Sequence, residues 1–283
     1  MGSMNTYTLE NGVKIPVLGF GTWQTPAGQT AKDAVKAALD AGFTHIDTAE
    51  MYGNEASIGE AIKESGVARD ELFITSKLDN QAHSYDLATA ALEKSLADLQ
   101  TDHLDLFLIH WPNPKAFRDE NWEEHLQDTW RALEDAYKAG KVRAIGVSNF
   151  KPKHFEVLAQ TQTVKPMVNQ IRICPGDLDQ ETIAYCQANN ILLEAYSPFG
   201  TGKIFTDKTL NALAETLDQS VAQICLRWSL QHGFLPLPKS VHPDRIKSNT
   251  EVFDFELTES EMQQIDDLTG IAGYATDPDT ADF

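Results

Sequence analysis

Short apolar runs alternate along the chain with longer stretches in which apolar residues recur every three or four positions. The short runs are typical of buried strands and the longer stretches of amphipathic helices. Strands are expected at residues 18–21, 45–47, 72–76, 104–109, 142–147, 167–170, 191–195 and 234–237. Helices are expected after them, at residues 31–41, 55–65, 85–99, 130–139, 152–160, 181–189, 221–231 and 243–249.

This alternation predicts an α/β fold with a parallel sheet, because strands joined through helices run in the same direction. Eight such units in 283 residues, with no linker rich in Pro, Gly or Ser, favour a (β/α)8 TIM barrel formed by one domain over residues 1–283. An open doubly wound sheet is the competing fold.

Several segments lie outside the repeat. The Asn11-Gly12 pair predicts the turn of an N-terminal β-hairpin, and residues 1–3 are interpreted as a cloning remnant. Residues 112–127 and 200–217 are expected to form loops at the C-terminal face of the barrel, where such enzymes bind substrate. Extra C-terminal helical structure is expected after residue 257, and residues 270–283 then either cover that face or fray.

Composition limits the possible partners. The formal net charge of −19 argues against binding to nucleic acid or to an anionic membrane. We expect no membrane span and no secretory signal, because the chain has no run of about 18 apolar residues and no charged segment followed by an apolar one at its start. The three well-separated cysteines indicate a reducing, cytoplasmic location without a disulfide framework.

Four ionisable residues lie at or just beyond the ends of successive expected strands: Asp47, Tyr52, Lys77 and His110. A barrel would bring them together at one mouth. Each alone is more often structural, for example Asp47 and Lys77 as an ion pair, Tyr52 as a rim aromatic and His110 as a hydrogen-bonded strand-end histidine. Their joint placement favours a catalytic group.

The four residues suit reduction of a carbonyl group. Such a reaction needs a proton donor at the oxygen, and a free Tyr with a pKa of about 10 holds its proton too firmly. A nearby Lys77 ammonium could lower the pKa of Tyr52 by about three units, which requires roughly 4 kcal/mol. Asp47 would keep Lys77 charged, and neutral His110 could bind the substrate oxygen, orient the substrate or relay the proton.

The chain resembles the aldo-keto reductases, in particular the bacterial members that include the 2,5-diketo-gluconate reductases. The matching stretches are residues 19–22, 42–55, 74–77, 105–112, 141–150, 195–198 and 238–241, with Arg245 and Asn249. The resemblance implies that Asp47, Tyr52, Lys77 and His110 form a catalytic tetrad. It also implies reduction of aldehydes or ketones, with dicarbonyls and keto sugars among the candidates, by a monomer that uses NADPH.

The chain lacks the Gly-x-Gly-x-x-Gly turn of a Rossmann site, because Gln24 stands where the third glycine would be. The resemblance instead implies an extended cofactor across the barrel mouth, with Ser148, Asn149 and Gln170 hydrogen-bonded to the nicotinamide amide and Tyr196 stacked on its ring. The full set of implied cofactor residues is Ser148, Asn149, Gln170, Tyr196, Ser197, Lys239, Ser240, Val241, Arg245 and Asn249.

Within this set, Lys239, Ser240 and Arg245 would hold the adenosine 2′-phosphate and so favour NADPH over NADH. The alternative is that these residues form an ordinary helix end, at which Lys239 and Arg245 simply face solvent. The chain departs from the family pattern at two places. Ser248 stands where many relatives have Glu, which weakens the implied preference for NADPH, and Arg172 stands where relatives often have an acidic residue. The second change extends over Arg172-Ile173-Cys174, before Pro175, and its consequence is not evident from sequence.

Trp23, Trp111 and Phe199 are candidate walls of a pocket for a small carbonyl substrate, although each could be core packing. Two other functions remain open. A nicotinamide-binding regulatory protein with little turnover would keep the same cofactor site. A metal-dependent barrel hydrolase is disfavoured because the chain has no His-Glu-x-x-His and no evident ligand cluster, so no bound metal is expected.

Overall fold

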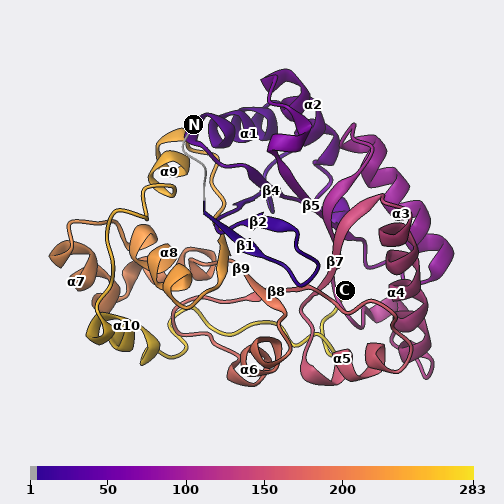
Figure 1. Ribbon diagram of the computed structural model, residues 1–283. Helices are drawn as coiled ribbons and strands as arrows, with labels where there is room; N and C mark the ends of the chain where they lie inside the picture. Colours follow the sequence, from indigo (N-terminus) through magenta and orange to yellow (C-terminus); the bar gives the residue numbers. More distant parts are fainter. Residues whose placement is uncertain (1–4) are drawn as a thin grey trace.

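The computed structural model describes residues 5–283; the expected cloning remnant at residues 1–3 lies outside the described part. Eight parallel strands form one sheet in chain order. They are β3 (Phe20–Gly21), β4 (His45–Asp47), β5 (Phe73–Leu78), β6 (Leu104–Ile109), β7 (Val142–Ser148), β8 (Val168–Arg172), β9 (Leu192–Tyr196) and β10 (Leu235–Leu237). The helices surround these strands, as Figure 1 shows.

The sheet closes into the expected barrel between its first and last strands. The Gly19 N–H donates to the Pro236 carbonyl at 3.2 Å, and the Gly21 N–H donates to the Pro238 carbonyl at 3.0 Å. Glycine is needed at position 19, because a Cβ there would lie 2.5 Å from the Leu237 side chain. The competing open sheet is therefore wrong.

The eight helices that follow the strands are α1 (Gln29–Ala41), α2 (Glu55–Ser65), α3 (Tyr85–Asp98), α4 (Trp122–Lys138), α5 (Pro152–Ala159), α6 (Gln180–Ala188), α8 (Val221–Gln231) and α9 (Pro243–Ser248). Two helices lie outside this repeat, α7 (Lys208–Thr216) after β9 and α10 (Glu259–Asp266) near the C-terminus. Four short 3-10 turns, η1 (Glu50–Tyr52), η2 (Arg69–Glu71), η3 (Lys115–Phe117) and η4 (Gly200–Thr206), complete the described elements. None of the described helices is long and apolar enough to cross a membrane.

Helix α4 begins earlier than expected, so the first long loop is shorter. Its first turn carries Glu123 and Glu124, which favour the positive end of the helix dipole. Leu126 and Trp130, four positions apart, are both buried on one face. Residues 122–127, expected as part of the loop at residues 112–127, are therefore helical. The second long loop likewise contains η4 and α7.

An antiparallel hairpin, β1 (Thr6–Thr8) and β2 (Lys14–Pro16), precedes the barrel as expected. It lies across one end of the barrel in Figure 1. Leu9 and Ile15 join a buried apolar cluster with residues near the starts of the barrel strands, among them Phe73, Val168 and Leu235. The hairpin therefore closes the N-terminal end, and the carboxyl ends of the strands form the opposite mouth.

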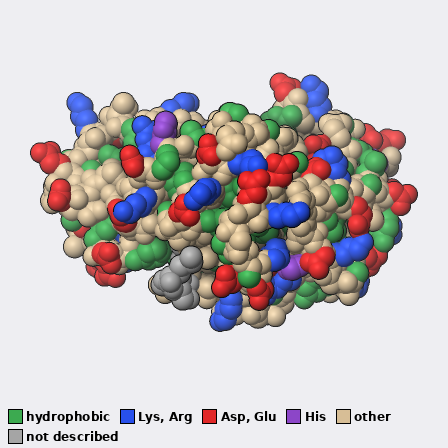
Figure 2. Space-filling view, turned by 90° about the horizontal axis from the view of Figure 1, so that it is seen from above, with side chains coloured by type: hydrophobic (Ala, Val, Ile, Leu, Met, Phe, Trp, Pro, Cys, Tyr) green, Lys and Arg blue, Asp and Glu red, His purple; other side chains and the backbone are tan. Residues whose placement is uncertain are grey.

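The C-terminal segment is folded over the barrel rather than frayed. His154 Nε2 lies 3.0 Å from an Asp279 carboxylate oxygen, and the Lys115 N–H donates to the Phe283 carbonyl at 2.9 Å. Acidic and basic side chains are scattered together over the face shown in Figure 2, within a chain whose net charge is −19.

Candidate active site

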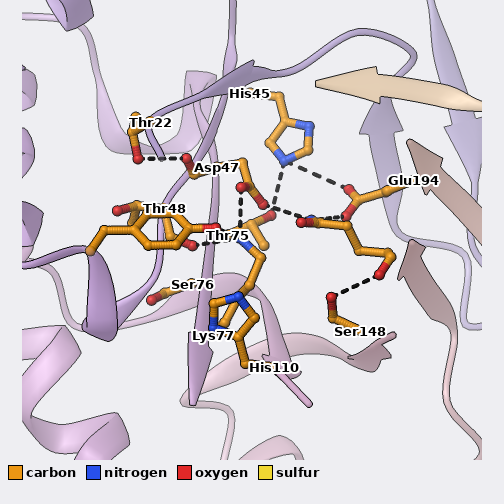
Figure 3. A network of polar contacts seen from close by, with 12 residues as sticks. Thr22, His45, Asp47, Thr48, Thr75, Ser76, Lys77, His110, Ser148 and Glu194 are labelled. Carbon is orange, nitrogen blue, oxygen red and sulfur yellow. Dashed lines mark hydrogen bonds and ion pairs between the residues drawn. The ribbon is translucent and has the colours of Figure 1, made fainter. Parts of the chain in front are cut away.

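The structure brings Asp47, Lys77 and Tyr52 into direct contact. Lys77 is the second-last residue of β5, and its side chain is fully buried. Its Nζ lies 2.7 Å from Asp47 Oδ1 and 3.4 Å from the Tyr52 hydroxyl. Nζ also donates to the Thr48 carbonyl at 2.9 Å. The parallel pairing of β4 with β5 places Asp47 and Lys77 near the carboxyl ends of neighbouring strands. Figure 3 shows the resulting group from close by.

The turn that carries Tyr52 is fixed by local structure. Tyr52 ends η1, and the chain leaves this turn at Gly53, whose positive φ of 66° suits glycine. Buried Asn54 then donates to the carbonyls of Thr22 and Thr25, both at 3.0 Å. The segment after β4 is thereby tied to the segment after β3, so the Tyr52 ring is held over the mouth.

His110 completes the expected group. It directly follows β6, is 8% exposed, and its ring centroid lies 5.7 Å from that of Tyr52 at an interplanar angle of 72°. Burial, together with the Lys77 charge, holds the pKa of His110 well below its usual value. His110 is therefore neutral at physiological pH and can hydrogen-bond a substrate oxygen.

The pKa of Tyr52 differs from the expectation. Burial raises it above 10, and this effect outweighs the lowering by Lys77. For Lys77, burial acts to lower the pKa, but Asp47 and Tyr52 together raise it above its usual value. In the free protein the pair is therefore phenol and ammonium, with the Lys77 charge in place to stabilise a phenolate once it forms.

A second layer of polar groups lies beneath these residues, and of its members only Gln170 was expected from the sequence. Gln170 Nε2 donates to Asp47 Oδ2 at 2.8 Å and to Glu194 Oε2 at 2.7 Å. Glu194 and His45 are fully buried, with His45 Nε2 3.9 Å from Glu194 Oε1 and 2.9 Å from the Thr75 hydroxyl. A single acidic residue in the apolar run of β9 was the only sequence signal for this layer.

The residues implied for the nicotinamide end lie on neighbouring strands. Ser148 and Asn149 end and follow β7, and the Ser148 hydroxyl donates to the Gln170 carbonyl at 2.7 Å. The Tyr196 hydroxyl donates to Asn149 Oδ1 at 2.8 Å. Asn149 and Ser197 have φ values of 61° and 50°, a strained conformation that is common where a chain bends at a functional site.

The residues implied for the phosphate end are grouped around α9. Lys239 is half-buried, which lowers its pKa, and its Nζ donates to the Gln24 carbonyl at 3.3 Å. The Ser240 hydroxyl accepts the His242 N–H at 3.1 Å. Arg245 is exposed on α9, Asn249 is buried at its end, and Val241 packs against the core.

The three candidate pocket residues have different surroundings. Trp23 is 47% exposed beyond β3, whereas Trp111 is 9% exposed and packs edge-on against Phe283 with ring centroids 4.7 Å apart. Phe199 packs against the core and against Phe205. Phe283 was missed by sequence reasoning, because its partner lies more than 170 positions away.

The structure explains the departure at Arg172. Its guanidinium pairs with Asp177 at 2.5 Å and donates to the carbonyls of Ala272 and Gly273 at 3.0 and 3.1 Å. Arg172 thus clamps the start of the C-terminal segment to the end of β8. An acidic side chain at position 172 would repel these carbonyl oxygens. Arg172 is therefore needed for the folded position of the C-terminal segment.

Comparison with known proteins agrees with this geometry. The Aldo/keto reductase family model matches residues 17–269. Glyoxal reductase from Bacillus subtilis (strain 168) is 46% identical over 275 residues, which cover 97% of this chain and 96% of that protein.

Two solved structures are similar throughout. An aldo-keto reductase from a Medee basin deep-sea metagenome library has a TM-score of 0.91 and 37% identity, covering 99% of this chain and 100% of that one. The Bombyx mori aldo-keto reductase in complex with NADP has a TM-score of 0.87 and 34% identity, covering 96% of this chain and 94% of that one. The chain belongs to the aldo/keto reductase family.

Proposed function

We propose that this protein reduces small aldehydes or ketones to alcohols with NADPH, and that Tyr52 donates the proton. The observation that carries the proposal is the buried Lys77 ammonium, 2.7 Å from Asp47 and 3.4 Å from the Tyr52 hydroxyl. When bound, NADPH supplies the hydride. Tyr52 gives its proton to the carbonyl oxygen, Lys77 stabilises the phenolate, and solvent returns the proton.

The other two members of the group assist this transfer. Asp47 keeps Lys77 charged, as the raised pKa of Lys77 indicates. Neutral His110, edge-on to the Tyr52 ring, orients the substrate oxygen toward the phenol. Trp111, Phe283 and the exposed Trp23 provide apolar walls. Because glyoxal reductase is a relative, we place small dicarbonyls first among the candidate substrates.

The polar side chains at the mouth fit the proposed cofactor. Ser148, Asn149 and Gln170 would bind the carboxamide, and Tyr196, held by Asn149, would stack on the ring. Ser197 would contribute from the adjoining turn. Half-buried Lys239 has a neutral carbonyl as its hydrogen-bond acceptor, so a phosphate would stabilise its charge. This assignment matches a neighbour solved in complex with NADP.

Ser240 and Arg245 would complete the grip on the 2′-phosphate, with Val241 and Asn249 beside them. Arg245→Ala should then weaken NADPH binding far more than NADH binding, as measured by titration of intrinsic fluorescence. Equal losses for the two cofactors would contradict this role of Arg245.

We also propose that the chain acts as one domain, as a monomer and in the cytoplasm. Its three cysteines are free and buried, which suits a reducing compartment. Sedimentation of the purified protein tests the monomer. The alternative of a regulatory protein with little turnover finds no support among the relatives, which are named as reductases.

The decisive experiment is NADPH oxidation over a panel of aldehydes, ketones and dicarbonyls, with NADH in parallel. Tyr52→Phe should lose about 100-fold or more of the rate, because it removes the proton donor and leaves the hydrophobic ring. Fluorescence quenching by NADPH should persist in this variant. Turnover near that of the wild type would refute the role of Tyr52.

A further inference from the structure

Gln170 is held in one amide orientation by two carboxyl groups. Its Nε2 donates to Asp47 Oδ2 at 2.8 Å and to Glu194 Oε2 at 2.7 Å, which uses both N–H groups. The flipped amide would point Oε1 at the Asp47 carboxylate oxygen and place lone pairs against lone pairs. Oε1 must therefore lie on the other side of the amide group from Nε2, away from both carboxyl groups.

Glu194 is placed for this contact by the sheet itself. It lies on β9 directly opposite Gln170 on β8, and its side chain is fully buried. Figure 3 shows it across the barrel interior from Asp47 and Lys77. Its second oxygen, Oε1, has no hydrogen-bond partner among the described residues. Among the described residues, the Glu194 side chain therefore makes one hydrogen bond, which it accepts from Gln170.

The charges around Glu194 are compatible with a holding role. Three titratable side chains from other strands face Glu194: His45 and Asp47 on β4 and Lys77 on β5. Burial, with repulsion from Asp47, raises the pKa of Glu194 to about 8, and burial lowers the pKa of His45 to about 3. Glu194 and His45 are then mostly neutral at pH 7, so they add no charge next to the Asp47 carboxylate and the Lys77 ammonium.

We propose that Glu194 is a positioning residue that fixes the Gln170 amide with its nitrogen toward Asp47 and its oxygen toward the carboxamide of the cofactor. The carboxamide carries N–H donors, which the Gln170 oxygen can accept. Through the shared Gln170 nitrogen, the same contact ties the cofactor end of the site to Asp47. The proposal rests on the function proposed above, in which Gln170 binds the carboxamide.

The test compares two ligands that differ only in the nicotinamide ring, which the second ligand lacks. These are NADP⁺ and 2′-phospho-ADP-ribose, titrated by calorimetry into the wild type, Glu194→Met and Glu194→Gln. Met removes one of the two acceptors of Gln170 Nε2 while keeping a long side chain, so only Asp47 holds the amide and the amide can pivot about that contact. Gln keeps a carbonyl oxygen that can accept from Gln170 Nε2, and is the matched control.

Glu194→Met should weaken NADP⁺ binding about fivefold to tenfold, the loss expected for one well-placed hydrogen bond. Binding of 2′-phospho-ADP-ribose should be unchanged, which also shows that the variant is folded. Glu194→Gln should stay within about twofold of the wild type for both ligands. Equal weakening of both ligands in either variant, or no change in Glu194→Met, would overturn the positioning role.

A double-mutant cycle provides a second measurement that does not depend on Glu194→Met alone. With Gln170→Leu as the background, Glu194→Gln and Glu194→Met should add no further loss of NADP⁺ affinity, because the residue through which Glu194 acts is absent. A further selective loss would overturn the proposal. Failure of the wild type itself to bind NADP⁺ would instead refute the proposed function, so the two failures are distinguishable.

Discussion

Replacing Lys77 with Met should destabilise the protein chiefly through the charge that it leaves behind on Asp47. Met fills a similar volume, so little packing is lost. Asp47, however, would keep only the Gln170 amide and lose its cation at 2.7 Å, in a place that is 3% exposed. An uncompensated buried charge of this kind is the costly outcome of breaking a buried ion pair.

The expected loss is about 3–5 kcal/mol, the usual range when one partner of a buried pair is removed. For a domain of this size, about 2–4 °C of thermal midpoint corresponds to each kcal/mol, so the midpoint should fall by roughly 10 °C. Asp47→Asn should lose less, because Lys77 would keep the Thr48 carbonyl as an acceptor and the Asn side-chain oxygen would replace that of Asp47.

The double variant Asp47→Asn/Lys77→Met separates charge from packing. Removing both charges should recover about half of the stability lost in Lys77→Met, whereas reductase activity should stay about 100-fold or more below wild type in all three variants. Thermal midpoints from circular dichroism for the four proteins give the coupling. Additive losses would refute the argument, because they would mean that the two charges do not stabilise each other.

Two further predictions concern residues outside the catalytic group. His83→Phe should flatten the loss of stability in acid, because burial lowers the pKa of His83 to about 3 and the unfolded chain gains the proton below about pH 6.5. Thermal midpoints measured from about pH 7 down to 4 should show the difference, up to ~1.4 kcal/mol per pH unit, and parallel curves would contradict it. Asp279→Asn should speed hydrogen exchange in the C-terminal segment, because it removes the carboxylate that binds Lys153 and His154. Unchanged exchange would show that other contacts hold the segment.

The sequence predicts those features for which the place of a residue along its strand fixes where that residue lies in the barrel. The alternation of strands and helices located the barrel, and parallel strands placed Asp47, Lys77 and His110 at one edge. Contacts between distant segments were not accessible in this way. Phe283 reaches Trp111 only because the C-terminal segment folds back over the mouth, and Glu194 matters only because Gln170 and Asp47 face it.

The pKa of Tyr52 shows why such contacts also decide the chemistry. Considered as a pair, Lys77 and Tyr52 predict a lowered phenol pKa, and the ammonium does lower it. The sign of the net shift is set by burial, which depends on every segment packed around the ring and cannot be obtained from two residues. The raised pKa keeps Tyr52 protonated in the free protein, but it also makes the phenol a weaker acid. A phenol whose pKa is raised is fully protonated at neutral pH, and the nearby cation lowers the energy of the phenolate only when the proton leaves.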